Sequence, residues 1–311
     1  MKEATLTSWQ EHTRQVARGI RRRVLDFTIR NNGGYLSQAC SSAEILSTLY
    51  TRVMHIGESQ APLIPPPFPG VPGKDNPHYF SGAAYNGPHS PEFDRFFISP
   101  VHCALALYAL LVELGRMHPQ GLDMFNKDGG TVEMIGAEHS PGHELMAGSL
   151  GQALSQAAGI ALARRLKGHT GRNWVFMSDG EFWIGQTWEA VQTLVFYKLD
   201  TVGVYIDANG QSADGKIETV MEIGSLKDRL TAFGARVFEV DGHDVEALAA
   251  PAALPPDGRP LFVIARTNPC QGIPLLEERR PRLHYVRFKD EAEKQRYREF
   301  LMIMEGSSHG A

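Results

Sequence analysis

Residues 174–215 read WVFMSDGEFWIGQTWEAVQTLVFYKLDTVGVYIDANGQSADG, which is a pattern of strand, helix and strand. The apolar run at 173–178 predicts a buried strand, and residues 201–207 predict a second one. The segment between them, 185–198, has the apolar spacing of a helix. A helix between two strands is typical of a parallel sheet, so this segment predicts an α/β fold.

The same alternation continues on both sides of this segment. We expect further strands at 95–99, 236–240 and 261–266, and helices at 7–30, 41–53, 101–116, 149–167, 223–233, 244–250 and 289–304. This order predicts a mainly parallel sheet with helices on both faces. We interpret residues 1–311 as a single domain, with a long ordered loop at about 60–92 and a charged C-terminal helical tail at about 289–304.

Composition narrows the class of protein. The chain has 311 residues and a formal net charge of -4, which argues against binding to nucleic acid or to a membrane surface. Its three cysteines, Cys40, Cys103 and Cys270, are far apart, so we expect a reducing, cytoplasmic environment and no zinc site. The basic run Arg21-Arg22-Arg23 is interpreted as a solvated helix face.

Each of the two central strands ends in a polar loop. The first ends at Asp179-Gly180, and the second leads into Asn209-Gly210-Gln211. Ligands of open α/β sheets bind at the carboxyl ends of the strands. A carboxylate, an amide and a nearby main-chain carbonyl suit Mg²⁺ or Ca²⁺, and Mg²⁺ favours phosphate oxygens as its other ligands. Asp-Gly and Asn-Gly are also common turn dipeptides, which is the alternative interpretation.

Several motifs, in order along the chain, resemble the transketolase family. Asp179-Gly180 followed thirty residues later by Asn209 resembles the family's thiamine diphosphate (TPP) signature. The other matching motifs are 94–99 with His102, Gly148-Ser149-Leu150-Gly151-Gln152 and Asp241-Gly242-His243-Asp244. The resemblance runs from about residue 12 to 300 and implies the TPP-binding fold of the family's diphosphate-binding (PP) domain.

The resemblance also implies cofactors and a site. The cofactors would be TPP and Mg²⁺ or Ca²⁺, with Asp179 and Asn209 binding the metal by their side chains and Gln211 by its carbonyl. The residues expected to contact the cofactor are His102, Gly148, Leu150, Asp179, Gly180, Glu181, Asn209, Gln211 and His284. Gly180 would let the main chain approach a phosphate closely.

The candidates for proton transfer or substrate contact are His102, His139, His143 and His284. Glu189 matches an acidic residue that lies between the active sites at the family's subunit interface. Each has a plainer alternative, because a lone histidine is more often a hydrogen-bonding residue than a catalytic one. Glu189 has the alternative of an exposed helix residue.

The implied activity is the transfer of a two-carbon ketol unit from a ketose to an aldehyde, with TPP supplying the carbanion chemistry. The chain resembles only the first of the family's domains. We therefore expect an N-terminal subunit of a split transketolase, which needs a second subunit with the pyrimidine-binding and C-terminal domains. The implied assembly is an α2β2 heterotetramer.

Three positions depart from the family pattern. Tyr35 and Ile135 stand where the family offers a substrate-side histidine, and Ile184 stands where it has a glutamate. These changes predict a substrate other than the common pentose phosphates.

Other functions remain open from the sequence alone. Within TPP enzymes, the alternatives are a 2-oxo-acid dehydrogenase or a 1-deoxyxylulose-phosphate-synthase-like subunit. Outside them, the alternatives are a non-catalytic regulatory or scaffold subunit and a nucleotide-dependent dehydrogenase, although the last lacks a G-x-G-x-x-G motif.

Overall fold

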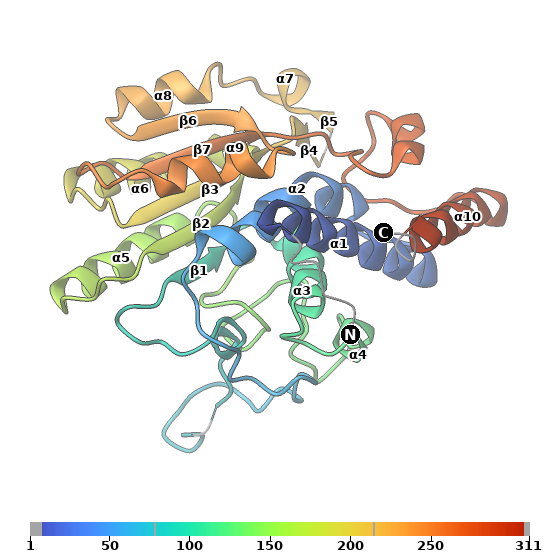
Figure 1. Cartoon of the computed structure of the whole chain (residues 1–311), viewed down its shortest axis with the longest axis horizontal. Helices are drawn as coiled ribbons and strands as arrows, with labels where there is room; N and C mark the ends of the chain where they lie inside the picture. The colour runs from blue at the N-terminus through green and yellow to red at the C-terminus, as the bar shows by residue number, and fades with distance from the viewer. Residues whose placement is uncertain (1–7, 78, 214, 308–311) are drawn as a thin grey trace.

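A five-stranded parallel sheet forms the centre of the computed structural model, which describes residues 8–77, 79–213 and 215–307. Its strands, in spatial order, are β1 (Arg95–Ile98), β2 (Asn173–Ser178), β3 (Val202–Ala208), β7 (Leu261–Arg266) and β6 (Arg236–Asp241) (Figure 1). All four strand pairs are parallel. The predicted α/β class and its mainly parallel sheet are therefore confirmed.

Helices cover both faces of the sheet, and alternate strand residues pack against them. On one face, Ile98, Phe176 and Tyr205 contact a core that includes α1 (Trp9–Asn31), α2 (Leu36–Thr48) and α3 (Ala104–Glu113). On the other face, Phe97, Val175 and Val204 contact α5 (Ala153–Leu166), α6 (Gly185–Phe196) and α8 (Leu226–Ala232). Burial on both faces explains why β2, β3 and β7 are nearly continuous apolar runs, whereas the edge strand β6 is only partly buried.

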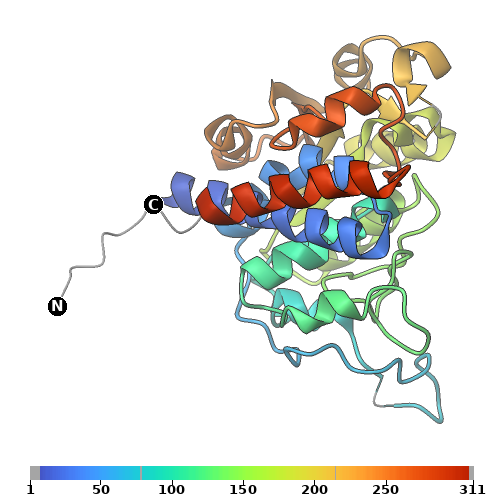
Figure 2. The same cartoon turned by 90° about the vertical axis from the view of Figure 1, so that its right-hand side faces the viewer.

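The remaining elements are short, apart from α10 at the C-terminal end. They are α4 (Gln120–Asp123), α7 (Ile217–Val220), α9 (Val245–Ala249), α10 (Glu291–Ser307), the hairpin of β4 (Gln211–Ser212) and β5 (Gly215–Lys216), the π-helix η1 (Leu49–Val53) and the 3-10 helices η2 (Gly82–Asn86), η3 (Val101–Cys103), η4 (Asp179–Trp183), η5 (Ala250–Ala253) and η6 (Pro274–Arg279). Helix α10 lies alongside α1 (Figure 2), where Arg22 and Glu305 approach to 3.6 Å.

The strand register sets the geometry of the functional edge. Ser178 of β2 is paired with Asp207 of β3, and Asp207 is paired with Ala265 of β7. At the far side of β7, Arg266 is paired with Asp241 of β6. The loops that follow β2, β3, β7 and β6 therefore all leave the sheet at one level.

Several predicted boundaries differ from the structure: α5 begins at Ala153 and not at Ser149, and α8 begins at Leu226 and not at Ile223. Helix α2 begins at Leu36 and not at Ser41, because the chain turns at Asn32, whose φ of 52° ends α1, and Tyr35 then takes the N-cap position. The expected helix at 101–116 is a 3-10 turn followed by α3. The sequence does not predict the hairpin β4–β5 or helix α7, since their short polar segment carries no periodicity.

The interpretation of Arg21-Arg22-Arg23 as a solvated face is wrong. Arg21 is buried, with 4% of its surface exposed, and its guanidinium contacts Glu44 of α2. Arg23 pairs with Glu113 of α3, and Arg22 lies 3.7 Å from the same carboxylate. This run therefore joins α1 to α2, α3 and α10, and its side chains are buried or only partly exposed.

The long loop packs on a second irregular segment, 129–140. The main-chain N–H of Phe68 donates to the carbonyl of Gly129 at 2.8 Å, and the Thr131 hydroxyl donates to the carbonyl of Pro66 at 2.9 Å. Gly82 has no room for a side chain, because a Cβ there would lie 1.8 Å from the Ser140 carbonyl.

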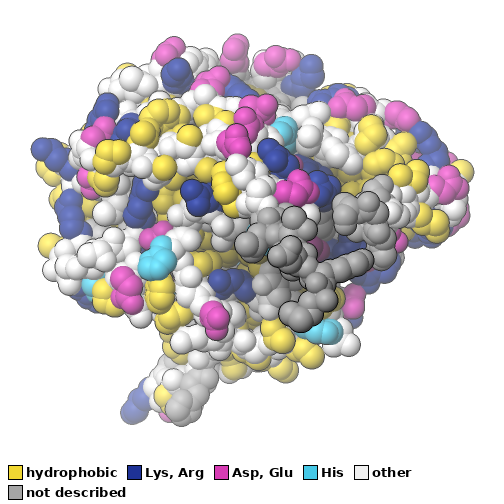
Figure 3. Space-filling view, viewed as in Figure 1, with side chains coloured by type: hydrophobic (Ala, Val, Ile, Leu, Met, Phe, Trp, Pro, Cys, Tyr) yellow, Lys and Arg dark blue, Asp and Glu magenta, His cyan; other side chains and the backbone are white. Residues whose placement is uncertain are grey.

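The surface seen in Figure 3 carries Lys and Arg side chains interspersed with Asp and Glu. In the part of the chain that the structure describes, no helix is both long and apolar enough to span a membrane.

Candidate metal and diphosphate site

A cavity of about 460 Å³ lies at the carboxyl edge of the sheet. It is lined by all three residues that the sequence predicts to bind a metal, which are Asp179, Asn209 and Gln211. The structure therefore brings together two loops that are thirty residues apart in the sequence. The other lining residues are Ala208, Gly210, Lys216, Ile217, Glu218, Glu222, Ile223, Gly224, Leu226, Arg266 and Arg280.

Asp179 carries a poorly compensated negative charge. Its oxygens accept hydrogen bonds from the main-chain N–H groups of Gly180 and Gly210, both at 2.9 Å. Burial and the nearby Asp207 carboxylate nevertheless raise the pKa of Asp179 to about 7. A bound cation would relieve both causes, so this carboxylate suits a metal ligand.

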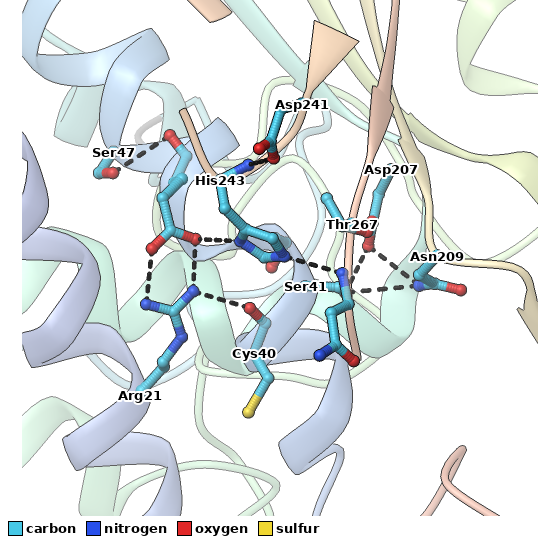
Figure 4. Close-up of polar contacts among 12 residues, drawn as sticks. Arg21, Cys40, Ser41, Ser47, Asp207, Asn209, Asp241, His243 and Thr267 are labelled. Carbon is cyan, nitrogen blue, oxygen red and sulfur yellow. Dashed lines mark hydrogen bonds and ion pairs between the residues drawn. The ribbon is translucent and has the colours of Figure 1, made fainter. Parts of the chain in front are cut away.

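Asn209 is held in one orientation by Asp207 (Figure 4). Its amide nitrogen donates to the Asp207 carboxylate at 3.1 Å and to the Ser41 hydroxyl at 3.4 Å. Its amide oxygen accepts the main-chain N–H of Gln211 at 2.8 Å and retains a second lone pair. Asp207 thus fixes which end of the Asn209 amide faces the cavity.

Two further features leave room for a ligand. The side-chain oxygen of Gln211 is buried and has no hydrogen-bond partner among the residues that the structure describes. A Cβ added at Gly180 would meet nothing within 4 Å, so the main chain is open to close approach there. A buried acceptor without a donor costs free energy, and a ligand that fills the cavity would remove that cost.

The donor set fits Mg²⁺ together with a phosphate better than it fits a metal cage made only of side chains. Among residues 8–77, 79–213 and 215–307, no cluster of three or more His, Cys, Asp or Glu side chains is placed to hold a metal. One carboxylate and one amide leave several coordination positions for phosphate oxygens, as Mg²⁺ prefers.

Three cations that the sequence analysis did not single out also line the cavity: Lys216, Arg266 and Arg280. Arg266 is the last residue of β7, so it reaches the carboxyl edge of the sheet in the same way as Asp179, which follows β2. Arg280 belongs to an irregular segment, where its guanidinium contacts the side chains of Asn268 and Glu277. The one sequence signal for Arg280 is that it belongs to the arginine-rich run at 279–282, which does not indicate where its side chain lies.

Glu181 faces the protein and not the cavity. Its carboxylate is fully buried and accepts from the Ser99 hydroxyl, from the main-chain N–H of Gly151 at 3.0 Å, and from the N–H and hydroxyl of Ser178. Burial raises the pKa of Glu181 despite these four donors. The residue therefore ties the ends of β1 and β2 to the loop that carries Gly148 and Leu150.

That loop has a conformation that requires glycine. Gly148 has a φ of 134° and Gly151 a φ of 80°, both in the left-handed region. Ile135 lies against Gly148, because a Cβ there would be 2.7 Å from the Ile135 side chain. Leu150 is half-buried, and Ile135 has 58% of its surface exposed.

His102 and His284 lie side by side, with ring centres 5.2 Å apart. Tyr35 completes the group, at 6.2 Å from His102 and 5.5 Å from His284. The Gln38 amide contacts His284 at 3.2 Å. Burial, with a smaller effect from His284, lowers the pKa of His102 to about 4, so this imidazole is neutral at pH 7.

The other two candidate histidines are not in this group. His139 pairs with Glu133 at 2.9 Å and packs on Phe68, with ring centres 4.5 Å apart. His143 is 1% exposed and lies in the interior, next to Tyr108 and Gly136. Glu189 is exposed on α6.

Comparison with known proteins gives consistent matches. Residues 79–298 match the family described as transketolase, thiamine diphosphate binding domain. The chain is 32% identical over 296 residues to a putative uncharacterized transketolase family protein, y4mO, of Sinorhizobium fredii, covering 93% of this chain and 94% of that protein. It is 29% identical to one of the subunits of the apulose-4-phosphate transketolase of Actinobacillus succinogenes, covering 89% of this chain and 92% of that protein.

The fold is similar to that of a solved transketolase from Campylobacter jejuni, with a TM-score of 0.72 and 20% identity. The match covers 96% of this chain but only 47% of that protein, so the chain spans about half the length of that solved transketolase.

Proposed function

This chain belongs to the transketolase family, and we propose that it is the diphosphate- and metal-binding subunit of a split enzyme of that family. The reaction proposed is the transfer of a two-carbon ketol unit from a ketose to an aldehyde. The observation that carries the proposal is the convergence of Asp179, Asn209 and Gln211 on one cavity at the carboxyl edge of the sheet.

The proposed cofactors are TPP and Mg²⁺ or Ca²⁺. When bound, TPP supplies the carbanion chemistry of the reaction. Asp179 and Asn209 would hold the cation by their side chains, and Gln211 by its main-chain oxygen. Arg266 and Arg280 would offset the negative charge of the diphosphate, since both line the same cavity. Gly180 leaves space beside the main chain for this group.

The histidine group has a separate proposed role. His102 and His284 would contact the diphosphate or the substrate as neutral imidazoles, which can both donate and accept hydrogen bonds. The low pKa of His102 supports this form at neutral pH. Gly148 and Leu150 would line the cofactor, and Glu181 would act by positioning their loop. His139 and His143 are weaker candidates, because the structure places them among other side chains.

A partner protein is part of the proposal. Two relatives are named as subunits of apulose-4-phosphate transketolases, and a third is named as the SqwG subunit of a 6-deoxy-6-sulfo-D-fructose transketolase. By this likeness, the chain would assemble with a second polypeptide that carries the pyrimidine-binding and C-terminal domains, as an α2β2 heterotetramer. The exposed Glu189 on α6 would face that partner. The cytoplasmic location expected from composition stays a prediction.

The test is reconstitution. The full chain and its partner subunit, purified separately, are mixed and titrated with TPP in the presence of Mg²⁺ or of a chelator. We expect tight, metal-dependent binding and ketol transfer only from the mixture. Ketol transfer by the chain alone would refute the split architecture, and TPP binding that does not depend on a divalent cation would refute the metal site. Binding without any turnover would favour the non-catalytic alternative.

We also propose that the substrate is not a common pentose phosphate. Burial raises the pKa of Tyr35, so its hydroxyl stays neutral, and Ile135 presents an exposed apolar side chain beside Gly148. Ile135 can neither donate nor accept a hydrogen bond, and the Tyr35 hydroxyl can do both but does not titrate near neutral pH and carries a bulky ring. A site that recognises sugar hydroxyls through histidines loses discrimination when those histidines are replaced in this way. Steady-state kinetics of the complex with xylulose 5-phosphate and ribose 5-phosphate test this. A kcat/KM of roughly 10⁴ M⁻¹s⁻¹ or more would contradict it.

A further inference from the structure

Every residue of the motif Asp241-Gly242-His243-Asp244 has a distinct contact. The Asp241 carboxylate accepts the main-chain N–H of His243 at 2.8 Å, which closes a tight turn. Asp244 caps α9 by accepting the N–H groups of Glu246 and Ala247. Gly242 lies directly against Thr267, since a Cβ there would be 2.3 Å from the Thr267 side chain. The turn therefore packs on the loop that follows β7.

The His243 ring joins that loop to helix α2. Its Nε2 accepts the main-chain N–H of Asn268 at 2.7 Å, and its Nδ1 lies 2.9 Å from the Glu44 carboxylate. A main-chain N–H can only donate, so Nε2 carries no proton and Nδ1 must hold the proton given to Glu44. The ring is thus a neutral bridge with one fixed tautomer.

The Glu44 end of the bridge is rigid. The Arg21 guanidinium contacts both Glu44 oxygens and also donates to the Cys40 carbonyl at 2.8 Å (Figure 4). The side chains of Arg21 and Glu44 are only 5% and 8% exposed. Helices α1 and α2 therefore give His243 a fixed point from which to hold the loop after β7.

The other end of the bridge reaches the proposed site by two routes. The Thr267 hydroxyl donates to Asp207, and Asp207 in turn orients the Asn209 amide. The Asn268 side-chain oxygen accepts from Arg280 at 2.9 Å. Arg280 and Asn209 both line the cavity. One short loop, 267–268, thus contacts Arg280, which lines the cavity, and Asp207, which orients a second lining residue, Asn209.

We propose that His243 is a positioning residue for the cofactor site, and this inference rests on the proposed function. By accepting the Asn268 N–H, it fixes the height of loop 267–268 relative to the sheet edge. The position of loop 267–268 determines whether the Thr267 hydroxyl can orient Asp207. It also determines whether the Arg280 side chain extends into the cavity. His243 is not one of the described residues that line the cavity, so it would act through the loop and not by touching the cofactor.

Two substitutions separate the two bonds of the ring. In His243→Gln, the amide reaches the place of Nε2 and can still accept the Asn268 N–H. In His243→Asn, the shorter amide reaches only the place of Nδ1, so it can pair with Glu44 but leaves the Asn268 N–H without an acceptor. Both variants lose one contact, so a merely structural role predicts similar losses of thermal stability and no difference in affinity.

Two measurements are made on the full chain with its partner subunit. Calorimetry with TPP and Mg²⁺ should show affinity about 10- to 100-fold weaker for His243→Asn, the range seen when a supporting contact of a metal site is lost. His243→Gln should stay within about threefold of wild type on the same scale. Amide hydrogen exchange without cofactor should be faster at residues 267–270 in His243→Asn only.

The outcomes are distinguishable. Equal affinities for wild type and both variants would overturn this inference and leave the proposed function standing. The same loss in both variants would also overturn it, since the Asn268 bond would then not matter. If the wild-type complex bound no TPP, the proposed function would fail and this inference with it.

Discussion

The carboxyl edge of the sheet has an inner and an outer part that differ in how their polar groups are paired. In the inner part, Asp207 accepts three side-chain hydrogen bonds and Glu181 accepts four from side chains and main chain. In the outer part, Asp179 accepts two main-chain N–H groups, and the Gln211 side-chain oxygen accepts no hydrogen bond from any residue within 8–77, 79–213 and 215–307. Both parts come from the ends of the same two neighbouring strands, since Asp179 and Glu181 follow β2, Asp207 lies in β3, and Gln211 follows β3.

We interpret this difference as one between groups that support the fold and groups that are candidates for binding a ligand. A buried polar group that is fully paired holds neighbouring segments together and has no capacity left for a ligand. A group left without partners costs free energy unless a ligand supplies them. Strongly perturbed, poorly paired groups in a cleft are therefore candidates for function, and fully paired ones are candidates for support.

The largest effects are expected when one carboxylate in each part is replaced by alanine, which tests directly whether the two parts have different roles. Asp179→Ala should weaken Mg²⁺-dependent TPP binding by about 100-fold or more, because the metal and diphosphate lose a carboxylate. In the absence of cofactor, Asp179→Ala should have little effect on the free energy of unfolding. Asp207→Ala should lower that free energy by about 2–4 kcal/mol, since three donors lose their acceptor. Calorimetry with TPP and urea unfolding give the two readouts.

The contrast between the two variants is its own control. If Asp179→Ala destabilised the unliganded protein as much as Asp207→Ala, the outer carboxylate would be scaffold and the division would be wrong. Unchanged TPP affinity in Asp179→Ala would remove Asp179 from the proposed metal site.

His143 is a buried titratable side chain that lies away from the cavity, and it allows the cost of burying an ionisable group to be measured separately. Burial lowers the pKa of His143 to about 4, against 6.5 when exposed. Below pH 6.5, His143 is therefore protonated in the unfolded chain but stays neutral in the folded chain. The free energy of unfolding then decreases as the pH falls towards 4. Between pH 7 and pH 4.5 this loss is about 2 kcal/mol, from 1.36 kcal/mol per pKa unit.

The matched variant is His143→Leu, which cannot titrate. Urea unfolding of both proteins at pH 7 and pH 4.5 should show that the variant loses less stability on acidification. An equal loss would mean that His143 does not stay neutral in the fold. Ring contact with Tyr108 is lost in the variant at both pH values, so it cancels in the difference.

The smallest effect is expected at Gln211. Gln211→Leu removes the buried oxygen that has no donor, so the unliganded protein should gain about 1 kcal/mol of stability. TPP affinity should fall by no more than about tenfold, because the proposed main-chain ligand remains. Thermal unfolding with and without TPP measures both changes. Destabilisation of the unliganded protein would show that this side chain belongs to the scaffold.

How much of this could be predicted from sequence differs between the two parts. The sequence places Asp179 and Asn209 correctly at one edge because each follows an apolar strand, and parallel strands bring their ends to one level. The inner pairings have no such signal. Ser41, Thr267 and Asp207 come from three distant segments, and no periodic pattern indicates that their side chains meet.

Irregular segments mark the other limit. His139 and His143 lie in a stretch without helix or strand, where neither a register nor a helical face fixes direction. The sequence could not show that one would pack on Phe68 and the other would be buried. Arg21 illustrates the same limit in a helix, since its partner Glu44 lies on another helix and removes it from water.

The short helix η4 has a practical consequence. It begins at Asp179 and ends at Trp183, so an indole and the proposed metal ligand belong to the same short helix. Trp174 is buried, 1% exposed, with its indole N–H bonded to Asp94, and so provides a constant background. Trp183 shares η4 with Asp179, so we expect its intrinsic fluorescence to report loading of the proposed site over the background of Trp9, Trp174 and Trp188.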